Sequence, residues 1–305
     1  MEKIVLITGA AGFIGRYTAR CYHKHGWYVI GLGHGSWSEN EQKVWGIDEW
    51  HSADCNFTGL SVARGERADV IVHAAGSGSV GLSIKHPEVD FSRNTCCTAE
   101  VLGFIRQCAP SARLVFLSSA AVYGMVKKLP IEESCPLQPI SPYGMHKKIS
   151  EELCQLYGRQ YGVASIAVRL FSVYGAGIRK QLLWDACNKL VSNTALFWGT
   201  GQETRDWIHV EDVAELLFTV KDFAMNTSPR VNGGCGKSVS IDTVVHELAD
   251  SLGYDGKVLF NGQVDVGNPH DYLADVSKAL SWGWKPEKTL TEGIKEYVAW
   301  YKAQR

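Results

Sequence analysis

The chain has 305 residues, enough for one large domain or two lobes with a sizeable core. Its 31 lysines and arginines balance 32 aspartates and glutamates, so we expect no nucleic-acid partner and no membrane surface as a partner. No apolar stretch approaches the ~20 residues that span a bilayer, and the first residues already resemble a strand. The nine cysteines show no Cys-x-x-Cys and no paired Cys/His spacing, which indicates thiols in a reducing compartment, a cytoplasmic location and no metal site.

Apolar runs alternate with helix-like stretches over the first half of the chain. The strand-like runs are Ile4–Thr8, Tyr28–Leu32, Val70–His73, Arg113–Leu117 and Ala164–Arg169, and the helical stretches are Phe13–His25, Ser92–Gln107 and Lys147–Tyr161. This alternation predicts an α/β fold with a Rossmann-like, doubly wound parallel sheet. Such a sheet binds ligands at the carboxyl ends of its strands, where the strand order reverses.

The regular alternation stops after Tyr174, where glycines, tryptophans and short runs take over. We therefore predict a cofactor-binding domain over residues 1–174 and a smaller substrate-binding lobe that occupies most of residues 175–305. Residues 205–225 are expected to return to the first domain, because Val210–Phe223 is typical of another of its helices.

The first strand runs directly into a Gly-x-x-Gly-x-x-Gly turn that opens a helix. Glycine lets the backbone approach a phosphate closely, and a helix N-terminus offers unpaired N–H groups to an anion. The turn therefore predicts a dinucleotide site, and the backbone that follows the Val70–His73 strand is expected to approach the same cofactor. The residues expected to contact the cofactor here are Gly9, Gly12, Phe13, Ile14, Gly15, Ala74, Ala75 and Gly76.

The second strand ends in Gly33-His34-Gly35-Ser36, without the Asp or Glu that NAD enzymes commonly hold there. A carboxylate would repel a 2′-phosphate, whereas His34 and Ser36 can donate hydrogen bonds to one. The sequence therefore favours NADP(H), with NAD(H) as the alternative. Asp54 is expected either to reach the adenine side of the cofactor or to serve as a plain turn residue.

Two segments carry residues suited to proton transfer. One strand ends in Ser118-Ser119, and Tyr143 and Lys147 lie four residues apart, on one face of a helix. The lysine ammonium is expected to lower the Tyr143 pKa from its usual value of about 10, so that the tyrosine exchanges a proton with a sugar hydroxyl. Lys147 would also hold the nicotinamide ribose, and Ser119 would position the reacting oxygen. His146 is expected to be an ordinary helix-surface residue, with assistance to a proton as the alternative.

In this order the motifs resemble the extended short-chain dehydrogenase/reductase family, in particular its nucleotide-sugar epimerases, dehydratases and ketoreductases. The resemblance covers nearly the whole chain through Thr8–Gly15, His73–Gly76, Ser118–Gly124, Tyr143–Lys147, Arg169–Gly175, Arg205–Ala214, Ala274–Lys278 and Leu280–Pro286. It implies an enzyme whose catalytic hydroxyl is on Ser119. It also implies a nucleotide-diphosphate sugar as substrate, bound mainly by the C-terminal lobe, and a homodimer through the helices Cys96–Gln107 and Lys147–Tyr161.

Departures from the family pattern narrow the reaction. Dehydratases that form 4-keto-6-deoxy sugars carry an Asp-Glu pair where this chain has Ala120-Ala121. Relatives resembling GDP-fucose synthase place a Cys and a His at Ala121 and Gly177, so double epimerisation is disfavoured as well. The missing acidic residue after Leu32 favours reduction of a 4-keto sugar by NADPH, and the alternative is 4-epimerisation with tightly bound NAD. A third interpretation, a non-catalytic protein that senses a dinucleotide, is less favoured. Such proteins typically lack the catalytic tyrosine or lysine, and this chain has both Tyr143 and Lys147.

The substrate contacts rest on weaker patterns. The resemblance implies that Arg205 pairs with the diphosphate, and a salt bridge to Asp206 or Glu211 is the alternative. The full set of expected substrate-binding residues is Ser79, Ser83, Ser172, Tyr174, Arg179, Lys180 and Arg205. Ser172 stands where many relatives have an asparagine. The segment Asn268–Tyr272 departs from the arginine-bearing pattern that is usual in the family, so the sequence does not decide whether it contacts the nucleotide. The sequence also leaves open which base and which sugar the substrate carries.

Overall fold

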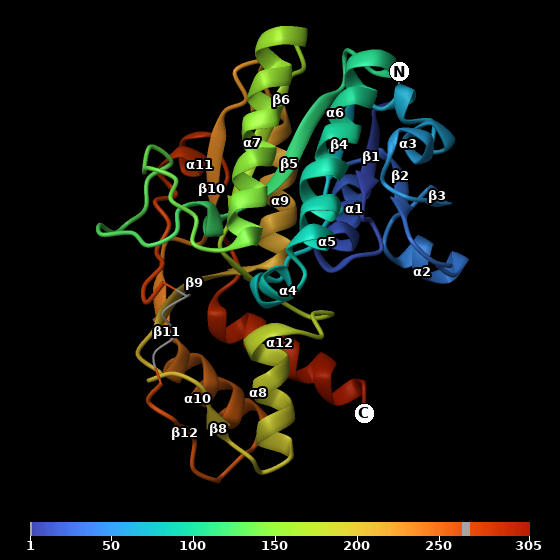
Figure 1. Ribbon diagram of the computed structural model, residues 1–305. Helices are drawn as coiled ribbons and strands as arrows, with labels where there is room; N and C mark the ends of the chain where they lie inside the picture. Colours follow the sequence, from blue (N-terminus) through green and yellow to red (C-terminus); the bar gives the residue numbers. More distant parts are fainter. Residues whose placement is uncertain (1, 264–268) are drawn as a thin grey trace.

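Seven parallel strands form the central sheet of the computed structural model, which describes residues 2–263 and 269–305 (Figure 1). From one edge to the other the strands are β10 (Arg230–Gly233), β6 (Ser165–Leu170), β5 (Arg113–Ser119), β4 (Val70–His73), β1 (Ile4–Thr8), β2 (Tyr28–Gly33) and β3 (Glu49–Ser52). The order reverses at β1, which lies between β2 and β4. This arrangement confirms the predicted doubly wound fold and places the switch point directly after Thr8.

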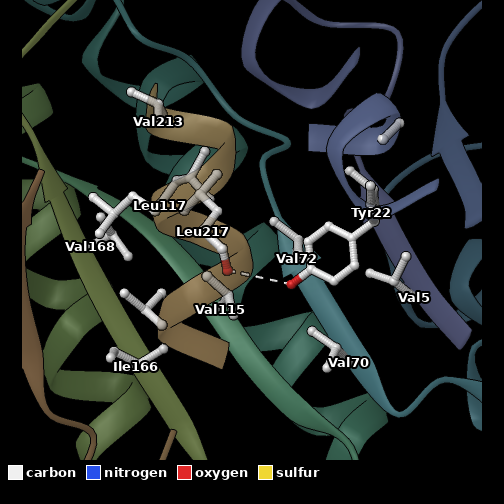
Figure 2. Close-up of a cluster of buried hydrophobic side chains, with 14 of the residues drawn as sticks. Val5, Tyr22, Val70, Val72, Val115, Leu117, Ile166, Val168, Val213 and Leu217 are labelled. Atoms are coloured by element: carbon white, nitrogen blue, oxygen red, sulfur yellow. Dashed lines mark hydrogen bonds between the residues drawn. The ribbon is translucent and has the colours of Figure 1, made fainter. Parts of the chain in front are cut away.

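Helices cover both faces of the sheet, because successive residues of each central strand are apolar on both sides. Val5 packs in the core of one face, and Leu6 packs in the core of the other. The helices on the Val5 side are α1 (Phe13–Lys24), α9 (Val210–Val220) and α11 (Ser277–Ser281), and those on the Leu6 side are α3 (Phe57–Val62), α6 (Cys97–Cys108) and α7 (Pro142–Tyr161). Figure 2 shows the Tyr22 hydroxyl of α1 donating to the Leu217 carbonyl of α9 at 3.4 Å.

Short helices lie in the connections on the α7 side and at the β2–β3 crossover. They are α2 (Glu39–Val44), α4 (Val80–Lys85) and α5 (Pro87–Phe91). One π-helical turn, Ser92–Cys96, leads from α5 into α6, so the predicted helix Ser92–Gln107 is regular only from Cys97 onward.

The smaller lobe lies below the sheet in Figure 1 and has its own apolar core. Its elements are β7 (Ser172–Tyr174), α8 (Gln181–Val191), β8 (Leu196–Phe197), β9 (Thr204–His209), β11 (Ser238–Ser240), α10 (Ile241–Leu252), β12 (Leu259–Phe260) and α12 (Leu290–Ala303). The chain passes between the lobes more than once, since α9 and β10 return to the large sheet. No helix in the described part of the chain is long and apolar enough to cross a membrane.

Candidate active site

A cavity of about 620 Å³ lies where the carboxyl ends of the sheet face the smaller lobe. Its volume falls in the range of about 300–1,000 Å³ that is usual for small-molecule sites. Predicted residues that line it are Gly9, Gly12, Phe13, Ile14, Gly15, Ala74, Ala75, Gly76, Ser119, Tyr143, Lys147, Ser172, Tyr174, Lys180 and Arg205. The fold therefore gathers residues from both parts of the chain around one space.

Backbone segments approach one another so closely at the glycine turn that there is no space for side chains. Gly9 has a φ of +69°, and a Cβ built on it would lie 2.8 Å from the backbone nitrogen of Ala75. A Cβ on Gly15 would collide with the Gly9 carbonyl oxygen. Gly12 at the N-cap of α1 has no side chain to satisfy the first N–H groups of the helix. The tight turn on the cavity wall and the helix N-terminus together fit the pyrophosphate of a dinucleotide.

Three of the predicted cofactor contacts, His34, Ser36 and Asp54, do not line this cavity. They lie at the exposed ends of β2 and β3, where His34 Nε2 is 3.5 Å from Asp54 Oδ1. The neighbouring strand thus supplies the carboxylate that the sequence lacks directly after β2. Strand order, which pairs β2 with β3, decides this placement.

The catalytic helix α7 begins immediately before Tyr143. The side chain of Ser141 accepts a hydrogen bond from the Gly144 N–H at 3.2 Å, and Pro142 occupies the first helical position. Lys147, one turn further on, donates from Nζ to the Leu117 carbonyl at 2.9 Å. Its Nζ atom lies 5.9 Å from the centre of the Tyr143 ring. The predicted pair therefore shares one helix face beside the end of β5.

The pKa values of this pair correct the sequence-based expectation. Burial raises the pKa of the Tyr143 phenol to about 12; the Ser119 hydrogen bond opposes this, and the Asp90 charge adds to it. Burial also lowers the pKa of the Lys147 ammonium to about 8. The expected lowering of the tyrosine pKa is wrong for this structure, because desolvation by burial is the largest influence on the phenol. At neutral pH Tyr143 therefore keeps its proton.

We expect Lys147→Met to stabilise the fold at neutral pH. A lysine pKa of about 8 in place of 10.5 corresponds to a folding cost of about 3 kcal/mol for the buried charge. The unfolded lysine binds the proton more tightly, so this cost is complete below pH 8 and disappears as the pH rises from about 8 to 10.5. Urea unfolding of the wild type and the variant should differ most at pH 6–7 and least near pH 10.5.

Lys148→Met is the matched control for this stability measurement. Lys148 is the next residue of α7, is more exposed, and forms only a 4.0 Å surface pair with Glu152. Its replacement should change the unfolding free energy by no more than about 0.5 kcal/mol. If Lys147→Met destabilises the protein at pH 7, the buried charge is compensated and the argument fails.

His146 is a second correction, because it does not lie on the helix surface. It is 9% exposed, and its Nδ1 atom lies 2.7 Å from Oδ2 of Asp90, which is itself buried in α5. The pair joins α5 to α7 next to Lys147. A helix periodicity does not reveal which of its polar residues another helix will cover, so the packing of α5 decides the burial of His146.

Ser79 and Ser83, expected at the sugar, do not line the cavity. Ser79 caps α4 by accepting from the Leu82 N–H at 3.2 Å. Ser83 is fully buried, donates to the Val80 carbonyl at 2.7 Å and accepts from the Tyr143 N–H at 3.1 Å. Its hydroxyl therefore positions the backbone of α7 at Tyr143 and does not line the cavity.

Tyr174 and Arg179 also depart from their expected roles. Tyr174 lines the cavity, but it is 1% exposed and its hydroxyl donates to the Thr289 carbonyl at 3.3 Å. Arg179 is exposed outside the cavity lining and donates to the side chain of Gln304. Both contacts involve the last helix of the chain, whose distant position in the sequence hides them from local patterns.

Arg205 lines the cavity, as expected for a diphosphate contact. Its Nη1 atom donates to the Thr204 carbonyl at 2.8 Å and to the His270 carbonyl at 2.9 Å. Asp206 is fully buried, and its carboxylate accepts from backbone N–H groups of the smaller lobe. Glu211 pairs with an arginine of α1 at 2.8 Å. The guanidinium is thus held by backbone carbonyls at the cavity wall.

The segment before Ala274–Lys278 contributes to the same wall. Pro269 and Tyr272 line the cavity, and the Tyr272 hydroxyl donates to the Gly124 carbonyl at 2.8 Å. Asn268 lies outside the described residues. Lining residues that the sequence did not single out are Ser77, Val80, Ile140, Gln181, Leu182, Trp207 and Ile241. Most are small or apolar, so only the fold identifies them.

Comparisons with known proteins agree with this geometry. A family model described as the NAD dependent epimerase/dehydratase family matches residues 5–232. A candidate UDP-glucose 4-epimerase of Methanocaldococcus jannaschii is 31% identical over 310 residues and 98% of each chain. A solved UDP-galactose 4-epimerase matches 99% of each chain with a TM-score of 0.84 at 26% identity. The UDP-glucose 4-epimerase of Thermus thermophilus, solved in complex with NAD, matches 99% of this chain and 100% of its own chain, with a TM-score of 0.87 and 25% sequence identity.

Proposed function

Because the chain belongs to the NAD dependent epimerase/dehydratase family, we propose that it is a nucleotide-sugar 4-epimerase that retains NAD between turnovers. The observation that carries the proposal is the meeting of Ser119, Tyr143 and Lys147 beside the glycine cradle. Ala120 and Ala121 line the same cavity and offer no carboxylate, which argues against dehydration. Relatives named as UDP-glucose 4-epimerases match 98% of the chain, and they favour epimerisation over the 4-ketoreductase predicted first.

The chain's own residues supply the proton chemistry of this reaction. NAD, when bound, supplies a hydride acceptor and donor for the sugar C4 atom. Tyr143 must first lose its own proton to solvent; the phenolate then takes the O4 proton as the alcohol becomes a ketone, and the phenol so formed returns that proton to O4 after the sugar has presented its other face. Ser119 holds O4 within reach, and Lys147 places a positive charge near the phenol. Each cycle leaves the cofactor and the tyrosine as they began.

The diphosphate is proposed to lie between Arg205, Lys180 and Ser172, which line one side of the cavity. A Cβ built on Gly78 would lie 3.9 Å from Lys180 Nζ, so this ammonium extends toward the loop that follows β4. Two cations and a hydroxyl suit a diphosphate flanked by a nucleoside and a hexose. The named relatives favour a UDP-hexose, and the smaller lobe, residues 175–305, is proposed to hold its nucleotide.

NAD is proposed in place of the predicted NADP(H), because of the position of Asp54. Its carboxylate lies 3.5 Å from His34, the residue expected to donate to a 2′-phosphate. An acceptor there favours ribose hydroxyls and repels a phosphate. Asp54→Asn should therefore raise the affinity for NADP relative to NAD, measured by titration of the cofactor-free protein. A wild type that prefers NADP would contradict this assignment.

Product analysis tests the proposed reaction. The purified protein is incubated separately with UDP-glucose and UDP-galactose without added cofactor, and the sugars are separated by chromatography. We expect interconversion in both directions with no net formation of NADH. A 4-ketoreductase would instead consume NADPH in a one-to-one ratio with a 4-keto sugar. Activity only toward carbonyl compounds without a nucleotide would overturn the substrate class.

A homodimer through α6 and α7 is also proposed. Phe91, Met145 and Leu156, on or beside α7, are large apolar side chains that are 40–43% exposed. Light scattering after size-exclusion chromatography should give twice the chain mass, and Leu156→Lys should reduce it to one chain. All nine cysteines are free, which supports a reducing, cytosolic location.

A further inference from the structure

Three side chains with metal-binding atoms meet behind the glycine cradle, although they are far apart in the sequence. Cys55 follows β3, His73 ends β4, and Cys97 begins α6. Their sulfur and ring-nitrogen atoms all lie within 4.8 Å of one another, and Cys55 Sγ is 4.0 Å from His73 Nδ1. None of the three lines the cavity described above, and the proposed epimerase chemistry uses none of them.

The hydrogen bonds around His73 determine which ring nitrogen is free to bind a metal. The Thr98 hydroxyl donates to the Asn94 carbonyl at 2.6 Å, so its oxygen accepts from His73 Nε2 at 3.3 Å. Nε2 therefore carries the ring proton, and Nδ1 carries the lone pair that would bind a metal and that accepts from the Thr8 hydroxyl in this structure. The Thr98 contact is the type of outer hydrogen bond that orients a metal-binding histidine.

Thr8 connects this cluster to the cradle. Its hydroxyl accepts from the Ala75 N–H at 3.2 Å and donates to His73 Nδ1 at 2.8 Å. A metal ion on Nδ1 would displace this second bond, and binding of Cys97 as a thiolate would also remove the hydrogen bond that its thiol donates to the Cys55 carbonyl at 3.1 Å. Thr8 directly precedes Gly9, so an ion in the cluster would lie against the strand that carries the phosphate-binding turn.

We propose that Cys55, His73 and Cys97 form a binding site for one soft divalent cation of the Zn²⁺ class. A tetrahedral zinc ion with Zn–S of about 2.3 Å and Zn–N of about 2.0 Å places its sulfur and nitrogen ligands roughly 3.6 Å apart. The observed 4.0 Å between Cys55 Sγ and His73 Nδ1 requires only small side-chain rotations to reach this value.

Charge and access also suit a divalent ion. Binding forms two metal–sulfur bonds and one metal–nitrogen bond, and it releases two thiol protons to solvent. Two thiolates then neutralise the charge of the ion, and a water molecule can complete four ligands. His73 is 1% exposed, whereas Cys55 and Cys97 are half-buried and give the ion a route from solvent. The bound ion would join β4 and α6 to the loop after β3.

Zinc binding to the full-length, reduced protein tests this site independently of any sugar chemistry. After incubation with Zn²⁺ and gel filtration, we expect about one zinc ion per chain by elemental analysis. Cys55→Ser and Cys97→Ser should each weaken zinc affinity at least tenfold in competition with a chromophoric chelator. Cys96→Ser is the matched control, because Cys96 adjoins Cys97 but is exposed and outside the cluster; its affinity should equal that of the wild type.

X-ray absorption of the zinc-loaded wild type provides a second measurement that does not depend on how the variants fold. We expect a first shell with two sulfur atoms. A shell without sulfur, or zinc affinity that is unchanged in Cys55→Ser and Cys97→Ser, would overturn the proposal and place the ion elsewhere. Failure of the reduced wild type to retain zinc would also overturn the proposal. That result would count against a zinc site even if Cys55 and Cys97 were found to form a disulfide in oxidised protein.

Discussion

Replacing Tyr143 with phenylalanine is expected to reduce the turnover of sugar interconversion by about 10²–10⁴-fold while the protein still folds and binds NAD. The hydroxyl is the group placed to exchange protons with O4, and each epimerisation cycle requires that exchange twice. The aromatic ring, which lies 5.9 Å from Lys147 Nζ, stays in the variant. The packing of α7 therefore should not change. The measurement is kcat for UDP-glucose and UDP-galactose, together with the NAD content of the purified variant.

Tyr161→Phe provides the control for this loss of activity. Tyr161 ends the same helix but is 55% exposed and far from the cavity lining, so the same atom is removed where no chemistry is expected. Its turnover should match that of the wild type. If Tyr143→Phe keeps full activity, another group moves the proton and the proposed mechanism is wrong.

The second prediction concerns the stability of the fold and a buried ion pair that holds α7 to the sheet. Arg169 of β6 is 2% exposed, and it donates to both carboxylate oxygens of Glu151 in α7, at 3.0 and 2.8 Å. Ser118 also donates to Glu151, at 2.6 Å. Since Ser118 precedes the catalytic serine and Glu151 lies one turn beyond Lys147, the pair sets the register between β5 and α7.

Breaking this pair should cost about 3–5 kcal/mol of unfolding free energy. Arg169→Met leaves the buried carboxylate with only the more distant and partly exposed Arg230, 3.6 Å away, and Glu151→Leu leaves the buried Arg169 guanidinium without its anion. The double variant should lose less than the sum of the two, because no charge stays uncompensated. Urea unfolding of the wild type, the two single variants and the double variant gives the coupling energy.

The surface pair of Lys189 and Asp185 is the control for the buried one. Its atoms are 2.9 Å apart, but the side chains are 32% and 57% exposed. Lys189→Met should therefore change the unfolding free energy by no more than about 0.5 kcal/mol. Single variants at Arg169 and Glu151 that stay within 1 kcal/mol of the wild type would show that the buried network has no such role.

Local patterns predicted the large sheet well. The five expected strands agree with the structure to within two residues at each end, because apolar runs bounded by glycine and polar residues have few other ways to pack. The smaller lobe was predicted only as a region. Its strands β8 and β12 contain two residues each, too few to show a period.

The candidate catalytic residues Tyr143 and Lys147 could likewise be named from their spacing, and Ser119 from the family resemblance, while the pKa values and burial of these residues could not be predicted. Tyr143 and Lys147 share a helix face because of the 3.6-residue turn, but burial in the folded site raises the tyrosine pKa and lowers that of the lysine. The packing of α5 buries His146, and strand pairing brings Asp54 beside His34. Each of these depends on a neighbour that is distant in the sequence.

The amino-acid sequence by itself determined the parallel sheet, the glycine cradle and the Ser119, Tyr143 and Lys147 set, because each rests on local periodicity or on short fixed spacings. Only the tertiary structure decided the protonation of Tyr143, the position of the Asp54 carboxylate beside His34 and the meeting of Cys55, His73 and Cys97. Those features arise where parallel strands and helices bring together residues that are distant in the sequence. The pairing order of the strands decides which residues meet, and no single segment of the sequence determines that order.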